Sequence, residues 1–336
     1  MIVVTLYHDE KQKDDSAAET ILAELQSEVP HKLVKVNVNA DEALKKVYKD
    51  HLPVIEVGPY ILREPYITRK DILVALMSAH DRKSELERIG DKDYMRRIEK
   101  SKQFSGADRF SYWFSLRYML LFNLIVFIYV GLPFVAPVLM KIGAQKPAKI
   151  IYTIYSPLCH QLAFRSWFLF GEQPVYPREL ANLEGLKTYE EISGDREVDI
   201  IKAREFIGNE ELGYKVAFCE RDIAIYGGML LFGIIFAVSG RKIKPLPWYF
   251  WILLGIIPIG LDGGSQLPGL VKGFLPAWLP IVERESTPFL RTLTGGLFGI
   301  STAWYLYPLI EETMQETRRV LARKKAIAEQ VDFGRE

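Results

Sequence analysis

The sequence predicts an α/β domain at the N-terminus followed by an all-α, polytopic membrane domain. Charged residues concentrate in residues 8–110, 172–222 and 311–336, whereas the segments between them are rich in Phe, Trp, Leu and Ile. Within the first 80 residues, short apolar runs alternate with amphipathic helical patterns, which is typical of parallel strand pairs. The overall composition conceals this division, because 49% hydrophobic and 25% charged residues are typical of an ordinary soluble protein. The net charge of +1 gives no support for nucleic-acid binding.

The α/β domain is expected to span residues 1–80. Its first half, MIVVTLY, SAAETILAELQSE, KLVKVNV and DEALKKVYKDH, predicts strand, amphipathic helix, strand and helix in that order. LPVIEV and YILRE then predict two more strands. A last helix should begin after Thr68, because Asp71 stands in the capping-box position.

This order of elements, with Pro53 just before a strand, resembles the thioredoxin and glutaredoxin superfamily. The resemblance implies a cis peptide bond before Pro53 and a redox site that faces it. The loop after the first strand is HDEKQKDD, however, and the domain contains no cysteine. Because thiol–disulfide exchange requires a thiolate, we expect a redox-inactive domain that docks a cytoplasmic protein.

Four segments further along the chain are predicted membrane spans. A basic, partly helical linker over residues 81–110 leads into a membrane domain over 111–310, and residues 311–336 form a charged cytoplasmic tail. Each apolar run approaches the roughly 20 residues that a helix needs to cross about 30 Å of hydrocarbon. The four runs are residues 112–140, 223–239, 247–261 and 293–310.

The orientation of the membrane domain follows from its basic clusters. With four spans, the residues around Arg96, Arg241 and Arg318 lie on one side of the membrane, as the positive-inside rule expects. Both termini of this multi-pass protein of the cell membrane should therefore be cytoplasmic. Residues 150–170 are apolar but contain chargeable groups, so they are predicted to form an outer interfacial or re-entrant helix. Residues 171–221 are expected to form an outer insertion, either a lid or a small subdomain over the site.

The two cysteines stand beside other metal-ligating residues. Ser156 and a following proline predict a helix start, which places Cys159 and His160 in the first turn. Cys219 and Asp222 are three residues apart and share a helix face. Three interpretations stay open: a disulfide between the cysteines, a zinc or iron site, or two unpaired cysteines packed as small hydrophobes. The metal ligands would be Cys159, His160, Cys219 and either Asp222 or Asp262.

Four motifs in this region are similar to a family of prokaryotic membrane proteins, domain of unknown function 2085. They are CHQ, CER before IYGG, DGGSQ, and RESTPFLRTLTGGLFG, over about residues 110–310. Members often carry Cys-x-x-C in the second motif, where this chain has Cys219 and Asp222. That departure keeps a metal ligand and removes a redox pair. The family supplies no reaction.

Arginines near the outer helix ends form a second set of candidate residues. Singly, they would pair with carboxylates such as Glu220, Glu283 or Glu285. Together they could instead bind an anionic small molecule or a membrane-lipid headgroup, because guanidinium groups bind phosphate in bidentate fashion. These substrate-binding candidates are Arg165, Arg221, Gln266, Arg284 and Arg291.

Three functions are therefore expected, in order of preference. The first is a metal-assisted enzyme with Asp262 as its catalytic residue, acting at the outer surface on a lipid-linked or anionic substrate. The second is a non-enzymatic transporter, metal handler or sensor. The third is a structural assembly factor with a disulfide between Cys159 and Cys219.

Overall fold

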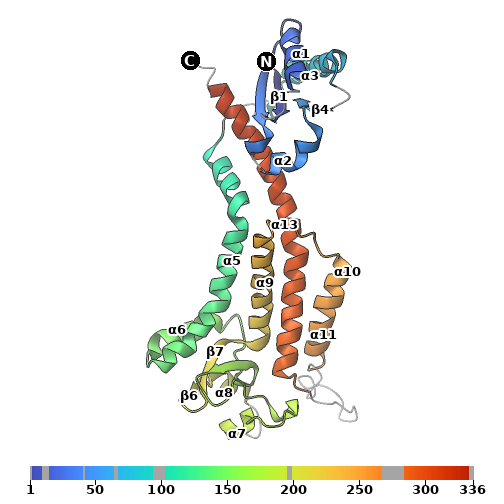
Figure 1. Cartoon of the computed structure of the whole chain (residues 1–336). Coiled ribbons are helices and arrows are strands. Elements are labelled where there is room, and N and C mark those ends of the chain that lie inside the picture. Colours follow the sequence, from blue (N-terminus) through green and yellow to red (C-terminus); the bar gives the residue numbers. More distant parts are fainter. Residues whose placement is uncertain are drawn as a thin grey trace. The chain divides into compact units, whose positions relative to one another are not determined.

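The computed structural model describes residues 2–9, 15–40, 42–63, 67–93, 103–194, 199–266 and 284–332. The chain divides into two compact units, each labelled by its elements in Figure 1. The first unit combines Met1–Arg117 with Glu312–Glu336, and the second is Tyr118–Glu311. The first contains a mixed α/β domain, and the second is mostly helical.

The α/β domain has the strands and helices that the sequence predicts. Its sheet has the order β2-β1-β3-β4, in which β1 runs parallel to β2 and antiparallel to β3. The Leu52–Pro53 peptide bond is cis, as predicted. The Thr68 side chain caps α3 by accepting the N–H of Asp71, which confirms the predicted helix start. The elements are β1 Ile2–His8, α1 Asp15–Leu25, β2 His31–Asn37, η1 Val38–Ala40, α2 Glu42–Tyr48, η2 Lys49–His51, β3 Val54–Val57, β4 Tyr60–Arg63 and α3 Arg69–Ile89.

Each face of this sheet carries its own hydrophobic core. Side chains alternate along β1, so Val4 and Leu6 pack under α1 and α3 while Tyr7 points to the other face. On that second face, α2 packs beside residues from the C-terminal part of α13, a helix that spans Pro288–Asp332. The α13 residues in this core are Ala322, Ala326 and Ile327.

Hydrogen bonds and an ion pair also fix α13 to the sheet. The side-chain amide of Gln330 accepts from the N–H of Lys35 at 3.0 Å and donates to its carbonyl at 2.6 Å. Gln330 therefore satisfies both backbone groups of one residue on the edge strand β2. Arg323 pairs with Glu56 at 2.6 Å on the same unit.

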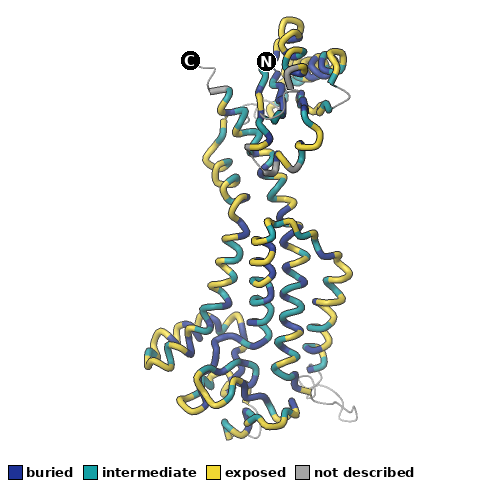
Figure 2. Tube along the Cα trace, in the orientation of Figure 1, coloured by how far each residue is buried: buried dark blue, intermediate teal, exposed yellow. Residues whose placement is uncertain are grey.

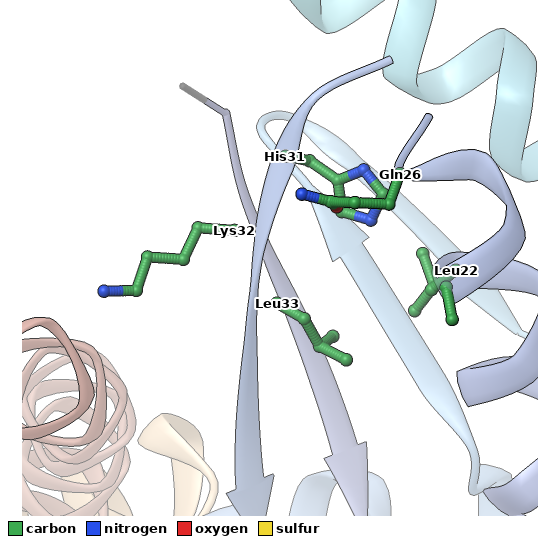
Figure 3. Close-up of a pocket in the computed structure, with 6 residues that line it drawn as sticks. Leu22, Gln26, His31, Lys32 and Leu33 are labelled. Carbon is green, nitrogen blue, oxygen red and sulfur yellow. The ribbon is translucent and has the colours of Figure 1, made fainter. Parts of the chain in front are cut away.

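An open hollow of about 460 Å³ lies between α1 and β2 (Figure 3). Gln26 and His31 lie together on one side of β2, whereas Lys32 extends to the other side (Figure 3). His31 is buried and its ring nitrogen bonds to the carbonyl of Val29 at 2.8 Å, so it serves the local structure. The described lining contains no thiol or carboxylate. It is formed by Leu22, Ala23, Gln26, His31, Lys32 and Leu33.

The second unit corrects the prediction of four spans. Within the described residues, two helices are long and apolar enough to cross a membrane, α5 over Gly106–Lys141 and α9 over Glu220–Val238. The third predicted span forms a shorter apolar helix, Trp248–Gly264. The fourth lies inside α13, where small and polar residues such as Thr294, Gly295 and Ser301 lower the hydropathy.

The apolar helix Trp248–Gly264 changes its hydrogen-bond pattern along its length. It consists of α10 Trp248–Trp251, a π-helical turn η5 Ile252–Ile256, and α11 Ile257–Gly264. A π-turn widens a helix by one residue and changes which side chains follow on each face. Asp262, near the end of α11, is buried.

The second unit is also not all-α, because a small antiparallel sheet interrupts it. The sheet has the order β5-β7-β6, and every residue of β7 except its last, Cys219, is buried. A strand buried on both faces lacks the alternation of polar and apolar residues that marks a half-buried strand, which is why the sheet was not predicted. We call residues 156–219 the cap. Its elements are η3 Ala163–Arg165, β5 Ser166–Leu169, η4 Glu179–Ala181, α7 Tyr189–Ser193, α8 Ile200–Glu205, β6 Gly208–Asn209 and β7 Gly213–Cys219.

The predicted helix start at Ser156 is wrong. A helix, α6, spans Gln145–Tyr155, and Ser156 is its C-cap, with its N–H bonded to the carbonyl of Thr153. Proline is common just after a helix end as well as at a helix start, so the Ser-Pro pair marks the other end of the helix here. Cys159 therefore lies in the turn that leaves α6.

Candidate functional site

Two cysteines and one carboxylate come together where the cap meets α9. Cys159 comes from the turn after α6, Cys219 ends β7, and Asp222 lies in the first turn of α9. One ligand atom from each lies within 4.8 Å of the other two. We call these three residues the thiol group. Both cysteines are free, so their sulfur atoms lie close together without a disulfide bond.

The local fold positions each member of the thiol group. Cys219 pairs with Ser166 in the cap sheet and is also the N-cap of α9. Its sulfur accepts the N–H of Asp222 at 3.4 Å, and its thiol donates to the Asp222 carboxylate at 3.0 Å. The predicted spacing of three residues therefore places both side chains on one helix face.

Backbone N–H groups also point at the sulfur of Cys159. The N–H groups of Gln161 and Cys219 lie 3.5 and 3.3 Å from that sulfur. Gln161 has a φ of 51°, and its side-chain amide donates to the carbonyls of Tyr152 and Ala217. Hydrogen bonds of this kind orient metal ligands and stabilise charge on sulfur.

A buried lysine lies behind the thiol group. Lys215 on β7 is fully buried, and its ammonium donates to the carbonyls of Gln161 and Arg204, each at 2.7 Å. Burial lowers the pKa of Lys215 to about 7. The hydrogen bond with Cys159, burial and the charge of Asp222 raise the pKa of Cys219 well above its usual value. Without a cation, the Cys219 thiol therefore retains its proton.

His160, a predicted metal ligand, points elsewhere. It is exposed, and among the described residues it does not belong to the thiol group. Consecutive residues project in different directions, which explains how Cys159 can be buried beside it. Asp262, the alternative carboxylate ligand, belongs to a second cluster.

That second cluster pairs the candidate arginines with carboxylates. Arg291, with only 3% of its side chain exposed, contacts Glu220 at 3.4 Å and Glu285 at a shorter distance. Arg165 from the cap reaches Glu285 at 2.8 Å and the amide oxygen of Gln266 at 3.2 Å. We call this cluster, with the Asp262 contacts below, the arginine network.

Asp262 is held by three side chains. One carboxylate oxygen accepts from Arg221 at 2.5 Å, and the other accepts from Ser286 at 2.7 Å and lies 3.6 Å from Arg284. The backbone carbonyl of Asp262 accepts from the amide of Gln266 at 2.9 Å. Both carboxylate oxygens are thus engaged within the protein.

The structure therefore brings every predicted substrate-binding residue into one network. Their partners Glu220 and Glu285 were anticipated from the sequence, while Glu283 lies outside the described residues. Lys215 and Gln161 were not predicted. Each contacts residues from another segment of the cap, and no local motif marks such contacts.

Part of the second unit matches a known protein family. Residues 208–305 match a family model described as Predicted membrane protein (DUF2085). The second unit is thus similar to a predicted membrane protein. The matched range is narrower than the 110–310 expected from the motifs; it includes Cys219, Asp222 and Asp262 but not Cys159 or Arg165.

The chain also resembles a protein known by sequence. It is 26% identical over 166 residues to Uncharacterized protein MJ1492 of Methanocaldococcus jannaschii, which covers 48% of this chain and 69% of that protein. No solved structure matches.

Proposed function

We propose that this protein is a multi-pass protein of the cell membrane that binds a zinc or iron ion through the thiol group. The proposal is carried by one observation, the convergence of two free cysteines and a carboxylate within 4.8 Å. Sulfur and oxygen ligands in this combination suit zinc or iron. Binding would replace the proton that the Cys219 thiol otherwise retains.

The hydrogen bonds favour a metal over a structural disulfide. Three backbone N–H groups, those of Gln161, Cys219 and Asp222, are directed at the two sulfurs. Such donors stabilise thiolate charge, which a disulfide does not carry. Asp222 would also have no role in a disulfide, whereas it supplies a third ligand to a metal ion.

The protein handles or senses the metal in this proposal. Three protein ligands leave one position of a tetrahedral zinc ion open for exchange. Asp262, the predicted catalytic residue, is committed to Arg221, Ser286 and Arg284. In this proposal the arginine network is therefore structural and holds α9, α11 and α13 to the cap.

A metal-assisted enzyme is the second candidate, favoured by that open position. There the metal itself would activate water, and an anionic substrate would have to approach the more exposed arginines. Arg284 and Arg165 have 42% and 34% of their side chains exposed. An anionic small molecule or lipid headgroup at these two residues remains part of this proposal.

The α/β domain would act as a cytoplasmic docking domain. Its strand order β2-β1-β3-β4, with β1 parallel to β2 and antiparallel to β3, supports a thioredoxin-like fold. The domain has no cysteine, so it would bind a partner protein without redox chemistry. Both termini lie in the cytoplasm in this proposal.

Elemental analysis of the purified full chain tests the metal site. We expect about one zinc or iron per chain, with affinity falling about 100-fold or more in Cys159→Ser, Cys219→Ser and Asp222→Asn, because each removes a ligand. His160→Ala is the matched control and should keep the metal.

Thiol counting under denaturing, non-reducing conditions completes the test. Two reactive thiols after metal removal agree with the proposal. A preparation without metal and without free thiols would instead show a disulfide, and the protein would then be an assembly factor. Turnover of a phospholipid by the metal-loaded protein, lost in Asp222→Asn, would favour the enzyme.

A further inference from the structure

Helix α6 has three faces of different character. Its buried face, formed by Ala148, Ile151, Tyr152 and Tyr155, packs against the core that α6 shares with α5 and β7. Successive helical residues turn by about 100°, which places Ile150 and Ile154 on a second face and Lys146 and Lys149 on a third. An ordinary surface helix has one apolar face and one polar face.

The second face of α6 is apolar and exposed. Ile150 and Ile154 are 60% and 52% exposed. Ile142 and Leu158, just outside the two ends of the helix, are also apolar and are 70% and 53% exposed. Figure 2 shows the exposed and buried sides of the helix alternating along its length. Water alone is an unfavourable environment for such a row.

The position of α6 indicates what covers this row. The helix follows the candidate span α5 after a turn of three residues, Ile142, Gly143 and Ala144. It runs across the lower end of α5 instead of continuing it (Figure 1). A helix that turns sideways at the end of a span lies along the membrane surface.

We infer that α6 is embedded in the surface of the lipid bilayer. Ile150 and Ile154 lie among the acyl chains, and Lys146 and Lys149 face anionic lipid headgroups. Interfacial helices combine an apolar row with flanking lysines in this way, and each lysine near an anionic surface adds to the attraction. The inference depends on α5 spanning the membrane and not on metal binding.

This placement has a consequence for the thiol group. Cys159 lies in the turn that follows α6, so the thiol group lies at the depth of the lipid headgroups. A metal ion would then enter and leave at the membrane surface.

Photo-crosslinking to lipid tests the inference in the intact chain. The full-length protein is placed in nanodiscs that contain phosphatidylglycerol and a phospholipid with a diazirine on its acyl chain, irradiated, and digested for mass spectrometry. We expect lipid adducts on Ile150 and Ile154 at yields within about tenfold of those on α5, because both contact acyl chains. Leu120 and Leu124 are the positive control, being 65% and 49% exposed on α5.

Val74 and Met77 on α3 provide the negative control, because they are comparably exposed but belong to the α/β domain. Adducts on α5 without adducts between residues 142 and 158 would overturn the inference. A dimer in the same nanodiscs that dissociates in Ile150→Glu would also overturn it, because a second copy would then cover the row. Thr153→Glu, on the polar side of α6, is the matched variant and should leave the adducts unchanged.

Discussion

Arg291 is the residue on which most of the arginine network depends. Its guanidinium bridges Glu220, which has no exposed side-chain surface, and Glu285, which is 6% exposed. Removing one partner of a buried ion pair leaves an uncompensated charge, whereas an exposed pair contributes little. Arg291 and Arg284 therefore differ in their expected contributions, although both were predicted to bind substrate.

We predict that Arg291→Met lowers the free energy of unfolding by about 3–5 kcal/mol, because it leaves the buried Glu220 unpaired and Glu285 with Arg165 as its remaining cation. Arg284→Met should cost less than about 1 kcal/mol, because its side chain is largely solvated. Thermal unfolding in detergent measures both. Equal stability of the two variants, with loss of anion binding in Arg291→Met, would show that Arg291 serves a ligand instead.

The residues of the candidate site were predictable where their role followed from their position along the chain. Arg165, Arg221 and Asp262 were identified because each lies near the end of an apolar segment, and the network contains all three. The direction of a side chain was not predictable. Cys159 and His160 are neighbours in sequence, yet the first is buried in the thiol group and the second is exposed.

At the scale of elements, α9 and α13 pack with their backbones in contact. A Cβ atom added to Gly299 would lie 2.0 Å from the carbonyl oxygen of Ile225, and one added to Gly228 would lie 2.9 Å from that of Gly296. Gly295 and Gly299 form the small-xxx-small spacing that brings membrane helices together. The TGG motif thus serves helix packing, one of the roles expected for its glycines.

We predict that Gly299→Ala destabilises the protein by about 1–3 kcal/mol or more, because its methyl group would force α9 and α13 apart. Gly296→Ala is the matched control in the same turn of α13. A Cβ atom there meets nothing within 4 Å among the described residues. Its higher helix propensity should even stabilise the helix, by up to about 1 kcal/mol. Similar melting temperatures for the two variants would contradict the close contact.

The length of the apolar runs in the sequence predicted some helices correctly and others incorrectly. The two spans confirmed as candidates are uninterrupted apolar helices, whereas Trp248–Gly264 is shorter and contains a π-turn. The cap sheet was missed because β7 is buried on both faces and so has no alternating pattern of polar and apolar residues. Its neighbour β5 is four residues long, too short for its pattern to be distinctive.

At the scale of the whole molecule, the last segment of the chain completes the first domain. Residues 311–336 were expected to form a separate charged tail. Instead Ala322, Ala326 and Ile327 cover one face of the sheet, and Gln330 binds the edge of β2. Gln330 and Lys35 are 295 residues apart, so no local pattern could reveal their contact.

We predict that Ile327→Asp loosens the α/β domain, because it removes a partly buried side chain from the second core, where full burial would be worth about 1.5–3 kcal/mol. Amide hydrogen exchange in β1 and β2 should become about tenfold faster or more. Lys325→Asp is the control, since Lys325 is half exposed and pairs only with Glu329 among the described ion pairs. Unchanged exchange in Ile327→Asp would mean that the domain is complete without α13.

The arginine network also has a consequence for how the protein is made. Glu220 leaves the ribosome 71 residues before Arg291, and Arg165 leaves it 120 residues before Glu285. A charged side chain is costly in the hydrocarbon core until its partner has been synthesised. The charged groups of the network therefore have to stay at the bilayer surface until then. The cap and α9 can therefore reach their final packing only after the first turn of α13 has been synthesised. Closure of the network is a late step of biogenesis, and a chain that stalls before residue 291 would expose unpaired acidic groups that membrane quality control could recognise.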